Sequence, residues 1–207
     1  MSLFPEKKFE IDMPTNGGIS ILLCGSTRSG KTTALAHILE TYFKKHVGVL
    51  FTESPQASIY KQMDIVQCPC YEPKIVKTMY QINRDTKNHY PFLVVLDDLV
   101  TAKFDKELLK TLTIYRNSQI SCIVSAQALT LFNSAGRTNI NIVILMKLNS
   151  DEQIEKCVKA YLGSYFPPNT RMLDKLRIYK ELTEDHHFFC INNLTGDVFV
   201  SKINIED

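Results

Sequence analysis

Residues 19–33 read ISILLCGSTRSGKTT, in which an apolar run leads into a loop of small residues and then into an amphipathic stretch. The spacing G-x-x-x-x-G-K-[ST] is met by Gly25, Gly30, Lys31 and Thr32. The apolar run predicts a strand and the residues after the loop predict a helix, which is the context that a phosphate-binding loop requires. The alternative is a chance glycine-rich turn before a helix.

The residue types in this loop follow from what a phosphate chain requires. Small residues let successive backbone N–H groups turn toward one point, and the following helix adds its positive end. We expect Lys31 to reach the β- and γ-phosphates, the Thr32 hydroxyl to ligate Mg²⁺, and Thr33 to contact the α-phosphate. The predicted nucleotide-binding set is Gly25, Ser26, Thr27, Arg28, Ser29, Gly30, Lys31, Thr32 and Thr33. Arg28 stays open between a solvated loop residue and a contact to base or phosphate.

Two carboxylates stand side by side in another apolar run, FLVVLDDLV at residues 92–100. Such a pair is costly inside a core, so a positive charge must lie close to it. We expect Asp97 to end a strand beside the phosphate loop and to hold the Mg²⁺ shell. Side chains alternate along a strand, so Asp98 points elsewhere, and we expect it to be the base that orients the attacking water. The alternative for Asp98 is a cap on the segment that follows.

Polar residues also flank the next two apolar runs. Gln127 follows one of them, where its amide could contact the γ-phosphate or the water beside Asp98; a plain loop residue is the alternative. Arg116 precedes the same run, and Arg137 precedes the next. Either arginine could lie at a subunit edge and stabilise charge on the phosphoryl group of a neighbour's nucleotide. Taken alone, each arginine is more simply explained as a surface residue.

Short apolar runs alternate with longer amphipathic stretches along the chain. Strands are predicted at 19–24, 47–52, 92–96, 120–125 and 142–146, with a short one at 65–67, and helices at 31–45, 73–88, 104–115 and 151–161. The strand runs are nearly continuous in apolar residues, as in parallel sheets covered on both faces. The pattern predicts an α/β fold: a three-layer P-loop NTPase with a mainly parallel central sheet.

The two ends of the chain differ from this pattern. Residues 187–203 read HFFCINNLTGDVFVSKI, with two β-rich runs around 193–197, and predict an antiparallel hairpin at one edge of the sheet. Residues 1–18 are expected to form an N-terminal arm. Residues 19–207 are then expected to form a single P-loop domain that includes the hairpin.

Composition sets limits on the partners and the compartment. The chain has 207 residues and a net charge of +2, too small to indicate a nucleic-acid partner by itself. It lacks the roughly 18 continuous apolar residues of a membrane span and the apolar core of a signal peptide. Cys68 and Cys70 have no second cysteine pair at zinc spacing, which disfavours a metal site and favours a reduced intracellular compartment.

The ordered motifs GSTRSGKT, VVLDD, RNSQISCIVSAQ and GRTNINIVIL resemble those of the FtsK–HerA superfamily of P-loop ATPases. More narrowly, they resemble the compact genome-packaging ATPases of poxviruses, giant viruses, virophages and membrane-containing double-jelly-roll viruses. The similarity covers about residues 19–148. Many members of the superfamily have Glu where this chain has Asp98, whose shorter arm requires a closer approach or a bridging water.

The resemblance implies an ATP-driven motor that moves viral double-stranded DNA into a preformed capsid. The implied cofactors are ATP and Mg²⁺. The implied partners are DNA, identical subunits in a pentameric or hexameric ring, and a capsid vertex or portal-like protein. The implied location is the host-cell cytoplasm at the viral factory, and also the virion. By this resemblance, Lys31 and Thr32 would bind the phosphates and the metal, and Asp97 would bind the metal. Asp98 would act as the base and Gln127 as the sensor. Arg116, or as second candidate Arg137, would act in trans on a neighbouring subunit.

Two other functions stay open from the sequence. A nucleoside or nucleotide kinase would need an arginine-bearing lid, and Arg171 and Arg177 come late, in a segment that looks helical. A nucleotide-dependent scaffold with little hydrolysis would not require Asp98 and Gln127. Within the motor hypothesis, the candidate DNA-contacting segments are 53–62 and 101–110.

Overall fold

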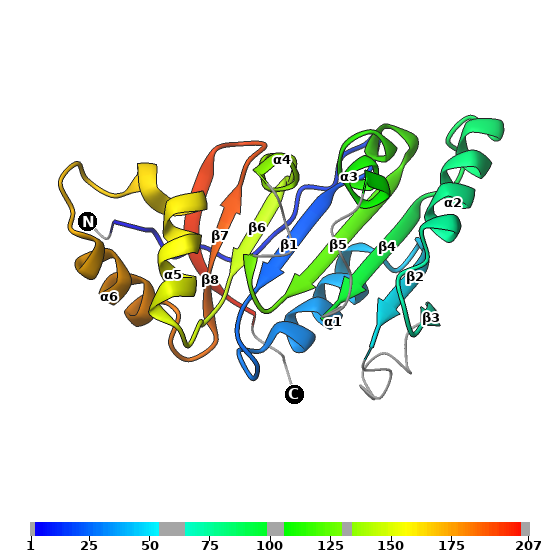
Figure 1. Cartoon of the computed structure of the whole chain (residues 1–207). Helices are drawn as coiled ribbons and strands as arrows, with labels where there is room; N and C mark the ends of the chain where they lie inside the picture. Colours follow the sequence, from blue (N-terminus) through cyan, green and yellow to red (C-terminus); the bar gives the residue numbers. More distant parts are fainter. Residues whose placement is uncertain (1–2, 54–64, 99–105, 130–133, 204–207) are drawn as a thin grey trace.

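The computed structural model describes residues 3–53, 65–98, 106–129 and 134–203. Within these residues, eight strands form one sheet in the order β3-β2-β4-β5-β1-β6-β7-β8 (Figure 1). The strands are β1 Ser20–Cys24, β2 Val47–Thr52, β3 Val66–Cys68, β4 Phe92–Asp97, β5 Ile120–Ala126, β6 Ile142–Leu145, β7 His187–Asn192 and β8 Asp197–Lys202. Strands β1 to β6 pair in parallel, whereas β7 is antiparallel to β6 and to β8. The predicted mainly parallel sheet is confirmed.

Strand β5 lies between the strand of the phosphate loop and the strand of the two acids. On one side Ser125 of β5 pairs with Leu23 of β1, and on the other side it pairs with Asp97 of β4. Asp97 was expected to end a strand beside the phosphate loop, and in the sheet that strand, β4, is separated from the phosphate-loop strand β1 by β5. Strand order depends on how the crossover connections run, which no local sequence pattern encodes. The neighbour of the phosphate-loop strand is instead the strand that leads into Gln127.

Helices cover both faces of the sheet and make the predicted three layers (Figure 1). Helix α1 (Lys31–Tyr42) packs on one face through Leu35 and Ile38. The other face is covered by α2 (Pro73–Asp85), α3 (Lys106–Thr113), α5 (Asp151–Cys157) and α6 (Met172–Leu182). Shorter elements are η2 (Tyr115–Ser118), α4 (Ser134–Thr138), the π turn η4 (Val158–Leu162) and η5 (Gly163–Tyr165). Among the described helices, none is both long and apolar enough to cross a membrane.

The C-terminal hairpin and the N-terminal arm close one edge of the sheet. The predicted hairpin is confirmed as β7 and β8, with β7 paired to β6. The arm runs beside β8, where Lys7 N–H donates to the carbonyl of Val200 at 3.0 Å and Val200 N–H donates to that of Pro5 at 2.9 Å. Phe4 and Phe9 are buried in the cores on the two opposite faces. The arm therefore covers an edge that would otherwise expose unpaired backbone groups.

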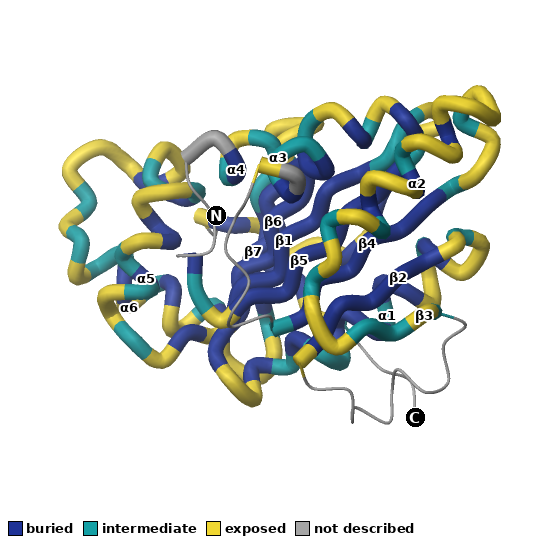
Figure 2. Tube along the Cα trace, turned by 45° about the vertical axis from the view of Figure 1, so that its right-hand side comes forward, coloured by how far each residue is buried: buried dark blue, intermediate teal, exposed yellow. Residues whose placement is uncertain are grey.

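Burial follows this architecture (Figure 2). The central strands are buried along their whole length, and the exposed residues gather on the outer faces of the helices and in the connecting loops. A strand buried on both faces cannot show its polar side chains to solvent. At the carboxyl ends of the central strands, buried polar side chains lie on the face that α1 covers, and a site can form there beside the first turn of α1.

Candidate nucleotide-binding site

The loop between β1 and α1 is held in place at its first residues. Gly25 N–H donates to the carbonyl of Ala126 at 3.1 Å, and Ser26 N–H donates to that of Lys147 at 2.9 Å. The Ser26 hydroxyl oxygen accepts the N–H of Asn149 at 2.9 Å. Gly25 and Ser26 belong to the predicted phosphate-binding set, but these bonds already use their N–H groups. Their role in the structure is therefore to fasten the loop to β5 and to the segment after β6.

The far end of the loop presents its N–H groups outward. The first bond within α1 runs from Ala34 N–H to the carbonyl of Gly30 at 2.9 Å. Helical geometry therefore leaves the N–H groups of Lys31, Thr32 and Thr33 at the open end of the helix, where an anion binds. Gly30 has a φ of 94°, which a glycine adopts without strain and which turns the chain into the helix.

The remaining loop residues differ in exposure. Thr27 and Arg28 are exposed, whereas Ser29 is buried. Exposure of Arg28 agrees with the solvated alternative for this residue. The buried hydroxyl of Ser29 has no hydrogen-bond partner among the described residues, so it can donate to a bound phosphate.

Lys31, Asp98 and Gln127 come together at the carboxyl end of the sheet. The Lys31 side chain is 5% exposed, and its Nζ lies 3.9 Å from Oδ2 of Asp98. The same ammonium donates to the carbonyl of Ser26 at 3.3 Å. Gln127 Nε2 donates to Oδ2 of Asp98 at 3.4 Å. Three residues that the sequence assigned to phosphate and water chemistry therefore share one site.

The backbone at Asp98 explains how its side chain reaches this site. Its φ is 45°, in the left-handed region that non-glycine residues rarely adopt, and its N–H donates to the carbonyl of Ser125 at 3.1 Å. Its second carboxylate oxygen, Oδ1, is buried and accepts no hydrogen bond from the described residues. That oxygen can therefore accept a hydrogen bond from a water molecule. The segment that Asp98 would cap begins at residue 99 and lies outside the described residues.

A row of three buried polar residues lies at the carboxyl ends of β2, β4 and β5. Thr52 pairs with Asp97, and Asp97 pairs with Ser125. Their exposures are 1%, 5% and 1%, respectively. They face α1, because side chains alternate along a strand and the residues two positions earlier belong to the core beneath α1: Leu50, Val95 and Ile123. The sequence interpretation missed Thr52 and Ser125, although each is the polar residue that ends or nearly ends an apolar run.

The residues predicted to hold Mg²⁺ fit that ion. Thr32 stands in the first turn of α1, and Asp97 lies on the strand face that α1 covers. A hydroxyl and a carboxylate are the hard oxygen donors that Mg²⁺ prefers, and Mg²⁺ is commonly held by one or two protein groups together with substrate phosphates. The Ser125 hydroxyl, buried and without a hydrogen-bond partner among the described residues, is available to orient the water shell of such an ion.

The two arginines lie at the other end of the strands. Arg116 belongs to η2, before β5, and Arg137 belongs to α4, before β6. With about 3.3 Å per residue, the seven residues of β5 separate its ends by roughly 20 Å. Arg116 therefore does not reach the phosphate loop of its own chain, and α4, which carries Arg137, lies at the same end of the sheet as α3 (Figure 1). Action on a neighbouring subunit stays a prediction.

Arg116 also takes part in a buried network at that end. Its Nη1 donates to Oδ1 of Asn141 at 2.8 Å, and the same oxygen accepts the N–H of Ser20 at 2.9 Å. Burial lowers the pKa of Arg116 from its usual value. No pattern in the sequence indicates this network, which joins the amino ends of β1, β5 and β6.

Comparison with known proteins identifies the family of this chain. Residues 6–195 match the protein family described as "Poxvirus A32 protein". This chain belongs to the poxvirus A32 family. The match includes the phosphate loop, both acids, Gln127 and the first strand of the hairpin. The resemblance drawn from the motifs of residues 19–148 is thereby confirmed at the level of the family and extends over most of the chain.

Solved structures share the fold of this A32-family chain. The genome packaging NTPase B204 from Sulfolobus turreted icosahedral virus 2, in complex with ATP-gammaS, is 12% identical, with 91% of this chain and 98% of that chain covered and a TM-score of 0.62. B204 from Sulfolobus turreted icosahedral virus, named as a DNA-packaging ATPase, is 13% identical, with 93% and 100% covered and a TM-score of 0.61. At such identities the likeness establishes the fold.

A third neighbour is named as a conjugation coupling protein. The pCW3 conjugation coupling protein TcpA, in its monomer form with ATPgS, is 14% identical with a TM-score of 0.66. The match covers 92% of this A32-family chain and 61% of TcpA. A search of curated protein sequences found no match to this chain.

Proposed function

We propose that this A32-family chain is an ATP-hydrolysing motor that packages viral double-stranded DNA into a preformed capsid. The observation that carries the proposal is the contact of Asp98 with both Lys31 and Gln127 beside the phosphate loop. A protein that only bound nucleotide would need the loop and Lys31, but not a carboxylate and an amide placed to handle water. Membership of the A32 family and the names of the B204 neighbours support the packaging role.

The geometry divides the work among the residues of the site. The N–H groups at the start of α1 and the Lys31 ammonium bind the phosphates. Phosphate oxygens compete with Asp98 for Lys31, so binding of the nucleotide releases the Asp98 carboxylate. Asp98 then accepts a hydrogen bond from the attacking water and takes its proton, while Gln127 orients Asp98 and the water.

Mg²⁺ belongs to this proposal as the partner of the phosphates. When bound, the ion supplies positive charge that offsets the charge on the β- and γ-phosphate oxygens. Thr32 and Asp97 would hold it. Burial of Asp97 beside Thr52 and Ser125 fixes the direction of its carboxylate, which a loosely held surface acid would not achieve.

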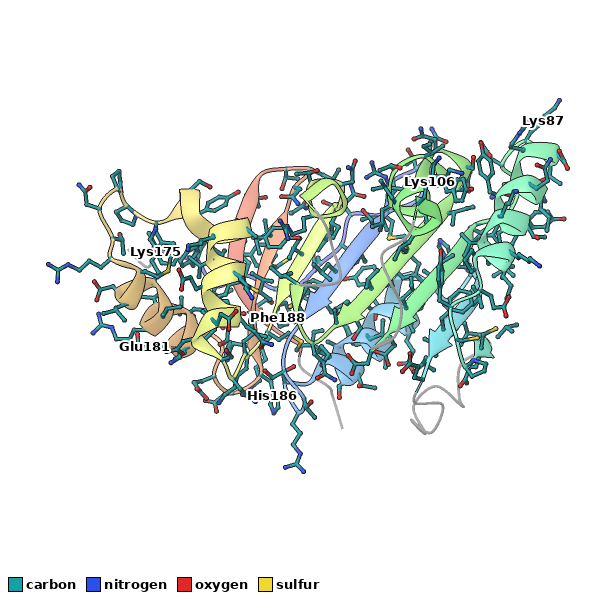
Figure 3. The ribbon with its side chains drawn as sticks, viewed as in Figure 1. Lys87, Lys106, Lys175, Glu181, His186 and Phe188 are labelled. Carbon is teal, nitrogen blue, oxygen red and sulfur yellow. The ribbon has the colours of Figure 1, made fainter. Side chains whose placement is uncertain are left out.

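The assembly and its partners complete the proposal. We infer a pentameric or hexameric ring around DNA, docked on a capsid vertex or portal-like protein in the host-cell cytoplasm. The candidate DNA-contacting segment 53–62 lies outside the described residues except for Glu53, and 101–110 is described only from Lys106 on. Figure 3 shows Lys106 toward the end of the sheet opposite to His186. A DNA contact there would therefore act at a distance from the nucleotide.

The test is ATP turnover measured with double-stranded DNA and, separately, with nucleosides. A packaging motor is expected to hydrolyse ATP faster when DNA is added and to transfer no phosphate to nucleosides. The Lys31→Ala variant serves as the control for contaminating activity. Phosphorylation of a nucleoside without any response to DNA would instead identify a kinase and refute the motor proposal.

A further inference from the structure

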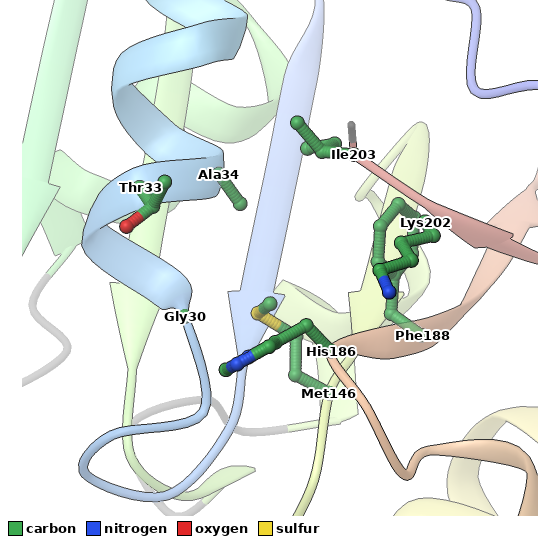
Figure 4. Close-up of a pocket in the computed structure, with 8 residues that line it drawn as sticks. All are labelled: Gly30, Thr33, Ala34, Met146, His186, Phe188, Lys202 and Ile203. Carbon is green, nitrogen blue, oxygen red and sulfur yellow. The ribbon is translucent and has the colours of Figure 1, made fainter. Parts of the chain in front are cut away.

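A cavity of about 320 Å³ opens between the first turn of α1 and the β7–β8 hairpin (Figure 4). Its floor is apolar and buried: Ala34, Met146 and Phe188. Its rim carries His186 and Lys202, which are exposed, and Ile203, which is half-buried. Small-molecule sites typically have volumes of about 300–1,000 Å³, an apolar lining and a few polar groups, and this cavity has those properties.

The cavity is continuous with the phosphate loop. Gly30 and Thr33, at the open end of α1, line it directly. On the hairpin side, Nδ1 of His186 lies 3.5 Å from the carbonyl oxygen of Ser29. Figure 4 shows the His186 side chain reaching from the turn before β7 toward Gly30. A molecule whose phosphates occupy the loop can therefore extend past Thr33 into the cavity.

The turn that carries His186 has an unusual backbone. Asp185 and His186 have φ values of 50° and 63°, so two consecutive non-glycine residues are left-handed. Such conformations are costly and persist only where the surrounding structure enforces them, often at ligand sites. Here Glu184 fastens the turn: its carbonyl accepts His187 N–H at 2.9 Å, and its carboxylate lies 2.8 Å from the Lys147 ammonium. The fold therefore holds an imidazole at the rim of the cavity.

We propose that this cavity receives the ribose and base of the nucleotide whose phosphates bind at the loop, with His186 and Ile203 contacting the base. The inference rests on the proposed function and adds the site for the nucleoside. Only three side chains of the described lining are polar, Thr33, His186 and Lys202, whereas the floor is apolar. An apolar floor and an imidazole contact the flat face of a base, which every base has, and not the hydrogen-bonding edge by which bases differ. The site therefore discriminates weakly between ATP and GTP.

The test compares a nucleotide with a ligand that has phosphates alone. Binding of AMPPNP and of inorganic tripolyphosphate, both with Mg²⁺, is measured by calorimetry. In His186→Ala, which removes roughly one stacking contact, the dissociation constant for AMPPNP is expected to rise about tenfold or more. A rise of similar size is expected in Ile203→Trp, because the indole fills the space that the base would occupy. The constant for tripolyphosphate is expected to stay within about twofold, because no phosphate contact is changed.

Two matched controls accompany these variants. His89→Ala removes an exposed imidazole that does not line the cavity, and Leu194→Trp adds an indole at the exposed turn of the hairpin. Both are expected to bind AMPPNP like the unchanged chain. Thermal unfolding of all four variants identifies any that fails to fold. The two cavity variants alter opposite properties, loss of a contact and filling of space, so one remains informative if the other unfolds.

The outcomes separate this inference from the proposed function. AMPPNP binding that is unchanged in both cavity variants, or weakened in parallel with tripolyphosphate binding, would overturn the base site. Binding of neither ligand by the unchanged chain would instead refute the proposed function, and Lys31→Ala is expected to lose both ligands. The dissociation constants for AMPPNP and GMPPNP are expected to agree within about tenfold, and a preference beyond about a hundredfold would overturn the weak discrimination.

Discussion

The ammonium of Lys31 lies 3.9 Å from Oδ2 of Asp98 and is almost completely buried. A buried cation needs a compensating partner, and in this chain Asp98 and the carbonyl of Ser26 provide it. The phosphates of a bound nucleotide bring stronger negative charge to the same ammonium. Asp98 is therefore a charge partner of Lys31 in this structure, and under the proposed function nucleotide binding releases it for another role.

Asp98→Asn is expected to abolish turnover without weakening nucleotide binding. The amide cannot take a proton from water, so ATP hydrolysis should fall about 100- to 10,000-fold, the usual contribution of a general base. The carboxylate also competes with phosphate for Lys31, so AMPPNP should bind at least as tightly as before. Turnover assays and calorimetry on one preparation measure both quantities. AMPPNP binding weakened as strongly as in Lys31→Ala would contradict the assignment of Asp98 as the base.

Asp97→Asn is expected to act on the metal instead. A neutral amide at the buried end of β4 is a weaker Mg²⁺ ligand than a carboxylate, so half-maximal ATP turnover should require a higher Mg²⁺ concentration. A Mg²⁺ titration at saturating ATP makes the measurement. Ser125→Ala, next to Asp97 on β5, should shift the titration in the same direction but less.

Substitutions at two glycines distinguish a glycine that the fold requires from a glycine that the phosphate loop requires. A Cβ on Gly18 would lie 2.2 Å from the carbonyl oxygen of Ile120, which is backbone and cannot move aside. Gly18→Ala should therefore lower the free energy of unfolding by at least about 1–3 kcal/mol. A Cβ on Gly25 would lie 2.5 Å from the Ser29 hydroxyl and 2.8 Å from Cβ of Met146, both side-chain atoms.

Gly25→Ala should therefore displace the phosphate loop more than it destabilises the core. Tripolyphosphate binding should weaken in Gly25→Ala, whereas Gly18→Ala should keep its affinity in the fraction that is folded. Chemical denaturation and calorimetry distinguish the two results. If the two variants lost stability equally and Gly25→Ala kept full affinity, the loop would not depend on the close approach of Gly25 to Ser29.

The strands and helices were predictable where the local pattern of apolar residues determines which side chains are buried. The strand bounds agree with the sequence within one residue at most ends, because an apolar run buried on both faces has few alternatives. The helix predicted at 31–45 ends at Tyr42 in the structure. The prediction was too long because the amphipathic pattern continues into Lys44 and Lys45, whereas the helical hydrogen bonds do not. The phosphate loop and the two acids carry spacing signals of their own.

The rest of the site depends on residues that only the folded chain brings together. The position of β5 between β1 and β4 follows from the crossover connections, so the pairing of Ser125 with Asp97 could not be predicted locally. His186 comes 157 positions after Ser29, and its left-handed turn has neither glycine nor asparagine to signal it. The sequence singled out Arg116 for a role in trans, which stays a prediction, whereas its bond to Asn141 depends on the register of the sheet.

A mixing experiment tests whether an arginine serves the nucleotide of a neighbouring subunit. Arg116→Ala removes the guanidinium and keeps the phosphate loop, and Lys31→Ala does the reverse. If Arg116 acts in trans, mixed rings contain some sites with both residues intact, so the mixture should hydrolyse ATP faster than either variant alone. ATP turnover is measured at fixed total protein over a range of ratios. The same assay with Arg137→Ala tests the second candidate.

Asn141→Ala is the control that the structure makes necessary. Arg116→Ala also removes the 2.8 Å bond to Asn141, so lost turnover could come from the amino ends of the strands rather than from a missing catalytic charge. Asn141→Ala disturbs the same network but keeps the guanidinium of Arg116. It is expected to lower the free energy of unfolding by roughly 1–3 kcal/mol. Turnover retained in Asn141→Ala but lost in Arg116→Ala would identify the guanidinium as the required group. Equal losses in both, with no recovery on mixing with Lys31→Ala, would mean that Arg116 only holds β1, β5 and β6 together.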